Sequence, residues 1–257
     1  MSTVEYPPTR RSARRPKPRR RRVTVLGVLG DLLLTAGVVV LLFVGWQLWI
    51  GDAIIGAQFK SEAGALTDEW AAAPTSPAPS TSPGDAAATE PPALAQPGNG
   101  EVFGVLRVPR LGPDYQFKLA GGVSASVTLD PIGIGHYPDT AMPGQQGNFA
   151  IAGHRGSHGA PFADLPSLRI GDAVVVETPD GWYTYRFRNL EYVRPDGVQV
   201  LLPTPQQPEV QATDKLITMT TCSPRYGSAE RAIAYGVFES FTPRADGPPA
   251  SLTSGAA

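Results

Sequence analysis

The protein has 257 residues, of which 42% are apolar and 18% are charged, and its formal net charge at pH 7 is −1. A single cysteine excludes a disulfide within the chain. The charge is unevenly distributed along the chain. The first 22 residues contain nine Arg and Lys and one acidic residue, Glu5, whereas the remainder has a net negative charge.

An apolar segment follows the basic head directly. No residue from Leu32 to Ile50 is charged, and Trp46 and Trp49 stand at its far end. About 20 apolar residues cross a bilayer as a helix, and tryptophan favours the headgroup region. We therefore predict a transmembrane anchor at residues 23–50. The positive-inside rule places the basic head, residues 1–22, in the cytoplasm and everything after the anchor outside the cell.

Two other interpretations of this region are weaker. A cleaved signal peptide has an apolar core of about 7–15 residues, and this core is longer. A basic cluster is also typical of nucleic-acid binding, but the positive-inside rule already explains these charges. We expect the protein to bind a membrane and no nucleic acid.

Residues 51–100 are predicted to form a stalk and linker. Residues 51–70 are rich in helix formers, whereas 71–100 form a Pro/Ala/Ser/Thr tract with too few bulky apolar residues to build a core. Such a tract is extended and semi-rigid. The tail at residues 244–257 has a similar composition and is expected to be disordered.

Residues 101–243 have the size of one domain. Short β-branched and aromatic runs alternate with Pro, Gly and Asp, and Pro179-Asp180-Gly181 is a tight-turn signal. This pattern predicts a mostly β barrel or sandwich with few helices. The clearest strands are expected at residues 102–108, 148–152, 173–178, 182–187, 190–193, 216–222 and 231–238.

The only cysteine, Cys222, ends one of these strands, and Arg231 opens the next. A nearby cation lowers the pKa of a thiol and favours the reactive thiolate. A buried cysteine acting as a small hydrophobe is the competing interpretation. A nucleophilic role requires a proton carrier elsewhere in the chain.

Histidine is the usual proton carrier, and the chain has three: His136, His154 and His158. An apolar strand ends at Gly153 and delivers His154 into a loop, where scaffolds present reactive groups. His154 and His158 have a spacing that suits zinc on a helix, but glycines surround them and no nearby carboxylate completes a ligand set. We therefore expect neither a metal site nor a cofactor.

In this order the motifs resemble those of sortases, the membrane-anchored cysteine transpeptidases of Gram-positive bacteria. The similarity spans residues 101–240. Thr218-Met-Thr-Thr-Cys222-Ser-Pro with Arg231 resembles the family's cysteine and arginine signature. Ala150-Ile-Ala-Gly-His154-Arg and the preceding segment 135–148 resemble its histidine motif. The Thr-Thr-Cys-x-Pro form and the long spacer are most similar to the actinobacterial class E.

The resemblance implies a closed sortase-type barrel of about eight strands with short helices. It implies that Cys222 is the nucleophile, His154 the general acid and base, and Arg231 the group that stabilises the oxyanion or holds the substrate. Thr220, Thr221 and Arg155 are further candidates for substrate contact.

The expected reaction is a two-step acyl transfer without a cofactor. Cys222 would cleave a Leu-Ala-x-Thr-Gly or Leu-Pro-x-Thr-Gly sorting signal of a secreted surface protein between Thr and Gly, through a thioacyl enzyme. A peptidoglycan-precursor amine would then receive the acyl group.

Two rival functions stay open at this point. An L,D-transpeptidase also pairs Cys and His, but its cysteine usually stands in a Ser-x-Gly-Cys setting shortly after a histidine, whereas Cys222 follows Thr220 and Thr221. The other rival is a non-enzymatic wall-binding or pilus-associated β module with Cys222 buried in its core.

Overall fold

A computed structural model describes residues 24–46, 50–73 and 90–253. The chain divides into two compact units, residues 1–44 and 45–257. Within the first unit, α1 (Val25–Gly45) is long and apolar enough to cross a membrane, and none of its residues is buried. The predicted anchor is therefore present as a helix. The basic head and Trp49 lie outside the described residues.

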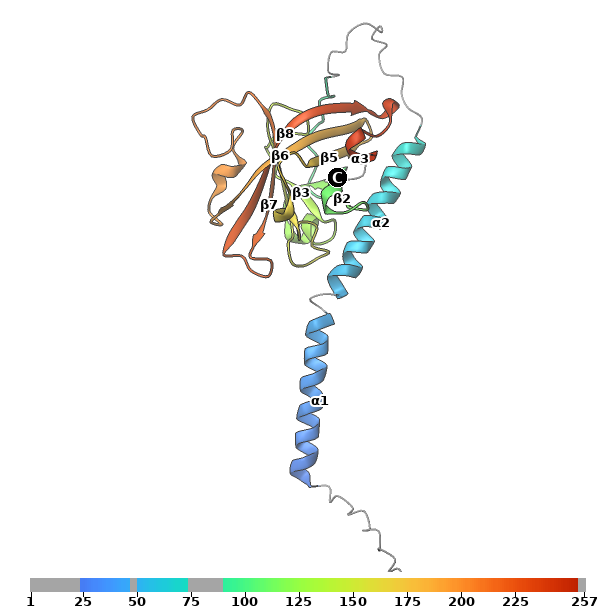
Figure 1. The fold of residues 1–257 in the computed structure, drawn as a ribbon, viewed down its shortest axis with the longest axis vertical. Helices are drawn as coiled ribbons and strands as arrows, with labels where there is room; N and C mark the ends of the chain where they lie inside the picture. Colours follow the sequence, from blue (N-terminus) through green and yellow to red (C-terminus); the bar gives the residue numbers. More distant parts are fainter. Residues whose placement is uncertain (1–23, 47–49, 74–89, 254–257) are drawn as a thin grey trace, which may run out of the picture. The chain divides into compact units, whose positions relative to one another are not determined.

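The second unit is built on a closed eight-stranded barrel, as predicted (Figure 1). Its strand order is β1-β2-β3-β4-β7-β8-β6-β5, and two neighbouring pairs, β2–β3 and β4–β7, are parallel. Closure leaves no unpaired sheet edge. The strands are β1 (Val102–Arg107), β2 (Gln116–Gly121), β3 (Ile134–His136), β4 (Gly147–Gly153), β5 (Ala173–Thr178), β6 (Gly181–Val193), β7 (Lys215–Ser223) and β8 (Glu230–Pro243).

Two strands were not predicted from the sequence. β2 alternates half-buried and buried residues, with Phe117 and Leu119 pointing into the core, but its lysine and glutamine weaken the pattern. β3 has only three residues, and its pairing with β2 and β4 defines it as a strand. The two runs expected at 182–187 and 190–193 form one strand, β6, whose register against β8 shifts twice.

Aliphatic and aromatic side chains from all eight strands fill the barrel. The largest fully buried ones include Tyr183, Tyr185, Phe149 and Met219. Tyr185 keeps its hydroxyl paired by accepting a hydrogen bond from the Gly144 N–H at 2.8 Å. This bond lets the barrel bury the tyrosine without leaving its hydroxyl unpaired.

The helix α2 (Gly51–Ala72) belongs to the barrel unit and is not a free-standing stalk (Figure 1). Phe59 is 4% exposed and joins the main core cluster. Lys118 Nζ lies 2.5 Å from Glu62 Oε2, and Lys60 Nζ lies 3.1 Å from Asp114 Oδ2. The sequence predicted the helix but not its docking, because docking depends on partners distant in the chain.

Phe59 packs where two loops meet. Its ring lies beside Gly133, which precedes β3, and Gly159, which follows β4 by a few residues. Gly159 also touches the backbone of Gly56, so closely that a Cβ at Gly56 would lie 3.1 Å from its carbonyl oxygen. The helix therefore supports the loop after β4 through a contact that leaves no room for a side chain.

The flanking segments are also more ordered than expected. Residues 90–100 lie against the barrel, and the Pro92 carbonyl accepts a hydrogen bond from the Tyr183 hydroxyl at 3.3 Å. In the predicted tail, Arg244 donates to the buried Glu177 carboxylate at 3.0 Å and stacks on Trp182. Only residues 74–89 of the expected linker and 254–257 of the tail lie outside the described part of the chain.

Replacing Phe59 with alanine should destabilise the barrel unit by about 3–5 kcal/mol, because it empties a buried aromatic site. Urea unfolding of a fragment that starts at Gly51 would measure this loss. Ile54→Ala is the matched control, since Ile54 is on the same helix but 57% exposed. Equal, small effects of the two substitutions would show that α2 does not dock in solution.

Candidate active site

The parallel pairing of β4 with β7 brings His154 and Cys222 to neighbouring positions. His154 follows the last residue of β4, and Cys222 is the penultimate residue of β7. Ala152 is opposite Thr220 in the register. Continuing that register by two residues sets His154 opposite Cys222. Parallel strands bring their carboxyl ends to one edge, so both side chains stand at the same end of the barrel.

Cys222 and Arg231 are direct cross-strand partners in the antiparallel pair β7–β8. Such partners have side chains on the same face of the sheet. Cys222 is partly exposed, so the thiol is not a core hydrophobe. The Arg231 guanidinium donates through Nη1 to the carbonyl oxygens of Ser228 and Glu230, at 3.1 and 3.0 Å. These bonds hold the cation at the mouth of the β7–β8 loop.

A carboxylate that the sequence analysis missed lies beside His154. Asp130 Oδ1 is 2.7 Å from His154 Nε2, and the side chains are 35% and 23% exposed. Asp130 ends the helical turn η3 (Ala125–Leu129) ahead of β3. No motif marks it in the sequence, because its distance to the histidine is set by the β2–β3–β4 pairing. It fixes one ring nitrogen of His154 and leaves the other for chemistry.

His158 completes this cluster. Its ring centroid lies 4.9 Å from that of His154, and its Nδ1 lies 3.8 Å from Asp130 Oδ1. His158 has a positive φ of 51°, which is uncommon for a residue other than glycine. The sequence analysis found no carboxylate to complete a ligand set around the two histidines, whereas the fold supplies Asp130.

The three residues expected to contact substrate have partners within the protein. Thr220 and Thr221 are 5% and 3% exposed. Their hydroxyls lie 3.0 Å from the Tyr137 hydroxyl and 2.8 Å from the Gly153 carbonyl oxygen, respectively. Arg155 Nη1 donates to Ser223 Oγ at 3.3 Å. The observed contacts tie β4, β7 and β3 together, and a role in substrate binding stays a prediction.

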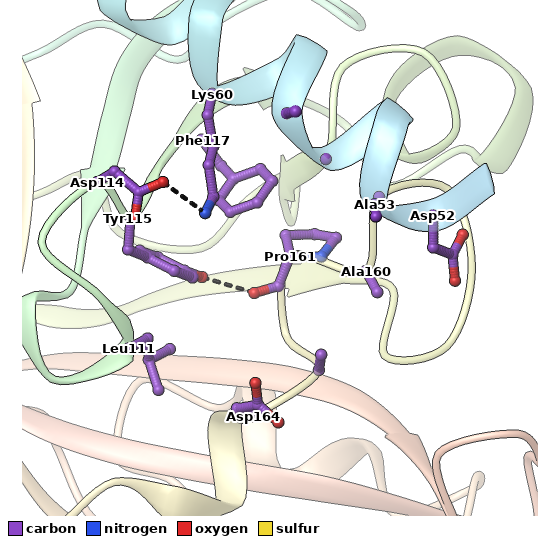
Figure 2. A pocket seen from close by; sticks show the side chains of 14 residues that line it. Asp52, Ala53, Lys60, Leu111, Asp114, Tyr115, Phe117, Ala160, Pro161 and Asp164 are labelled. Carbon is purple, nitrogen blue, oxygen red and sulfur yellow. Dashed lines mark hydrogen bonds and ion pairs between the residues drawn. The ribbon is translucent and has the colours of Figure 1, made fainter. Parts of the chain in front are cut away.

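A cavity of about 420 Å³ lies between α2, the β1–β2 connection and residues 159–164. Figure 2 shows the ion pair of Lys60 with Asp114 in its lining and the Tyr115 hydroxyl directed at the Pro161 carbonyl oxygen, 2.7 Å away. Its lining contains neither Cys222 nor His154. The cavity therefore borders the loop after His154 but is separate from the reactive groups.

His136 occupies a different environment from the other two histidines. It is 1% exposed, stacks on Phe149 at 5.2 Å, and its Nε2 lies 3.0 Å from Thr140 Oγ1. Burial lowers the pKa of His136, against a smaller opposing effect of its bond to the Ala141 carbonyl. This histidine is a neutral part of the core.

Comparison with known proteins identifies the fold and its chemistry. The family model "Sortase domain" matches residues 106–239. The chain belongs to the sortase family. Sortases are cysteine transpeptidases, so the protein is an enzyme of this class, and a purely structural β module is not favoured.

Individual relatives agree with this assignment. Sortase SrtE1 of Streptomyces coelicolor is 36% identical over 260 residues, covering 99% of this chain and 67% of that protein. A crystal structure of sortase E1 from the same organism, with a tripeptide in its active site, has a TM-score of 0.56 and 37% identity, covering 62% of this chain and 99% of that one. The SrtA sortase of Actinomyces oris has a TM-score of 0.60 and 36% identity, covering 63% of this chain and 93% of that one. The similarity to class E sortases expected from the sequence is confirmed.

The buried His136 should make sortase stability depend on pH. Its folded-state pKa is below the ordinary value of about 6.5, so the unfolded chain binds the extra proton first. The stability that the neutral His136 contributes is fully present at pH values above the unfolded-state pKa of about 6.5. It is lost as pH falls toward the folded pKa, by at most about 1.4 kcal/mol per pH unit.

Unfolding midpoints at pH 7.5 and pH 5 would test this expectation in the parent chain and in His136→Gln. The glutamine variant should be less stable at pH 7.5, because it loses ring packing, but its stability should change less between the two conditions. Equal changes in both chains would show that another group dominates.

Proposed function

We propose that Cys222, His154 and Arg231 carry out a two-step acyl transfer on the sorting signals of secreted surface proteins. The adjacency of His154 and Cys222 at the ends of β4 and β7 is the observation that carries this proposal. Cys222 as thiolate attacks the carbonyl carbon of the Thr–Gly bond. His154 as imidazolium gives its proton to the departing glycine amine, which leaves a thioacyl enzyme.

The second step reverses the proton transfer. A peptidoglycan-precursor amine attacks the thioester, His154 accepts its proton, and the new amide leaves with the Cys222 thiolate restored. Arg231 faces the same side of the sheet as Cys222. Its guanidinium stabilises the oxyanion of each tetrahedral intermediate or holds the substrate backbone, an effect worth about 100- to 1000-fold in rate for a comparable donor.

Asp130 positions His154 in this scheme. Its bond to Nε2, at 2.7 Å, orients the ring and stabilises the imidazolium, so that Nδ1 exchanges the proton with the substrate. Asp130 is a positioning residue rather than a group that touches the reacting atoms.

The reaction takes place outside the cell in this proposal. The helix α1 anchors the chain in the membrane. The nine basic residues ahead of it keep the N-terminus in the cytoplasm and send the barrel to the outer side, where wall precursors and secreted proteins meet.

The first test uses the full chain in detergent with fluorogenic peptides carrying Leu-Ala-x-Thr-Gly or Leu-Pro-x-Thr-Gly. We expect cleavage between Thr and Gly, with the Leu-Ala peptide preferred, and loss of all detectable cleavage in Cys222→Ala. Mass spectrometry should find a thioacyl adduct on Cys222. Cleavage that persists in the alanine variant would refute the assignment of the nucleophile.

Asp130→Asn should lower kcat by about 10- to 100-fold with little change in KM, a part of the 10²- to 10⁴-fold that proton transfer contributes. Asp139→Asn is the matched control on an exposed loop. A change confined to KM would instead assign Asp130 to substrate binding.

A further inference from the structure

We propose that Asp130, His154 and His158 form a zinc-binding site and that zinc bound there reversibly inhibits the transpeptidase. The candidate ligand atoms, two imidazole nitrogens and one carboxylate oxygen, all lie within 4.8 Å of one another. They come from two loops that the sequence separates and that the β2–β3–β4 pairing brings together. The metal site rests on these contacts alone, while its effect on activity rests on the function proposed above.

The spacing of the ligand atoms suits a small tetrahedral ion. Zinc–ligand bonds of about 2.0–2.1 Å require ligand atoms about 3.3 Å apart. The two contacts to Asp130 Oδ1 bracket that value, at 2.7 Å from His154 Nε2 and 3.8 Å from His158 Nδ1. Ångström-scale side-chain rotations are enough to close the set, which supplies three ligands and leaves the fourth position of a tetrahedral ion to water.

The chemistry of the donors selects the metal. Two imidazoles and one carboxylate suit zinc and related transition metals, whereas calcium takes six to eight oxygen ligands. Among the described residues, this cluster is the one group of three such side chains whose ligand atoms converge. The side chains are 35%, 23% and 45% exposed in chain order, so the ion can enter from solvent.

His158 has a strained conformation that the acyl-transfer scheme does not use. Its φ of 51° lies in the left-handed region, and this backbone presents the ring to His154 and Asp130. Gly159, packed against Gly56 of α2, fixes the loop immediately after it. Residues in sparsely populated conformations persist where the surrounding structure enforces them, often at functional sites.

A bound ion would stop proton transfer by His154. Zinc takes the lone pair of Nε2, and the proton that Nε2 donates to Asp130 leaves to solvent. The ring then holds its single remaining proton on Nδ1 and exchanges it poorly near neutral pH. Chelation removes the ion and restores the proton to Nε2, which makes the inhibition reversible.

Binding is tested on the full chain in detergent carrying Cys222→Ala, which removes the thiol as an alternative ligand. Competition with a chromophoric zinc indicator should show one zinc per chain. His158→Asn should weaken binding at least about 10-fold through loss of a ligand, while asparagine tolerates the positive φ. Asp139→Asn should bind as the parent does, and a large excess of calcium should not compete.

Inhibition is tested on the chain with Cys222 intact, by peptide cleavage. Zinc should inhibit, EDTA should reverse the effect, and His158→Asn should keep its basal rate but need at least about 10-fold more zinc for half inhibition. Zinc binding unaffected by His158→Asn, or binding that requires Cys222, would overturn the proposal. The zinc-binding measurement does not require peptide cleavage. If the peptides are not cleaved, the proposed function fails, while the binding measurement still tests whether the metal site exists.

Discussion

The active site depends on one pairing, the parallel alignment of β4 with β7. Both strands are neighbours in the barrel wall, and His154 and Cys222 each lie two residues beyond their last mutual pair, Ala152 with Thr220. The Thr221 hydroxyl reinforces the alignment through the Gly153 carbonyl at 2.8 Å. A slip of one residue would turn Cys222 to the opposite face and away from both His154 and Arg231. The pairing of β4 with β7 therefore brings His154 and Cys222, which are far apart in the sequence, to neighbouring positions.

The juxtamembrane helix extends that constraint to the loops. Phe59 fills the space between Gly133 and Gly159, which flank the segments carrying Asp130 and His158. The same helix is tied to the barrel wall by ion pairs to Lys118 and Asp114. A chain that begins after α2 would lose this support. This helix is thus part of the barrel unit and supports the loop that follows His154.

His154 lies at the centre of two competing equilibria. In the proposed acyl transfer, His154 carries a proton on Nε2 and pairs with Asp130; in the proposed zinc complex, a metal on the same nitrogen withdraws it from the reaction. One carboxylate serves both states, because it attracts an imidazolium and a metal cation alike. In these two proposals His158 takes part in metal binding alone.

The sequence by itself determined the anchor, the mostly β domain and the family, since hydrophobic length, strand periodicity and the motifs around Cys222, His154 and Arg231 are local patterns. It did not reveal β2 and β3, the docking of α2, the paired Arg244 in the expected tail, or Asp130 beside the histidines. Each of these depends on contacts between segments distant along the chain. A residue such as Asp130 has no distinctive neighbours in sequence, and only the closure of the barrel sets its distance from His154.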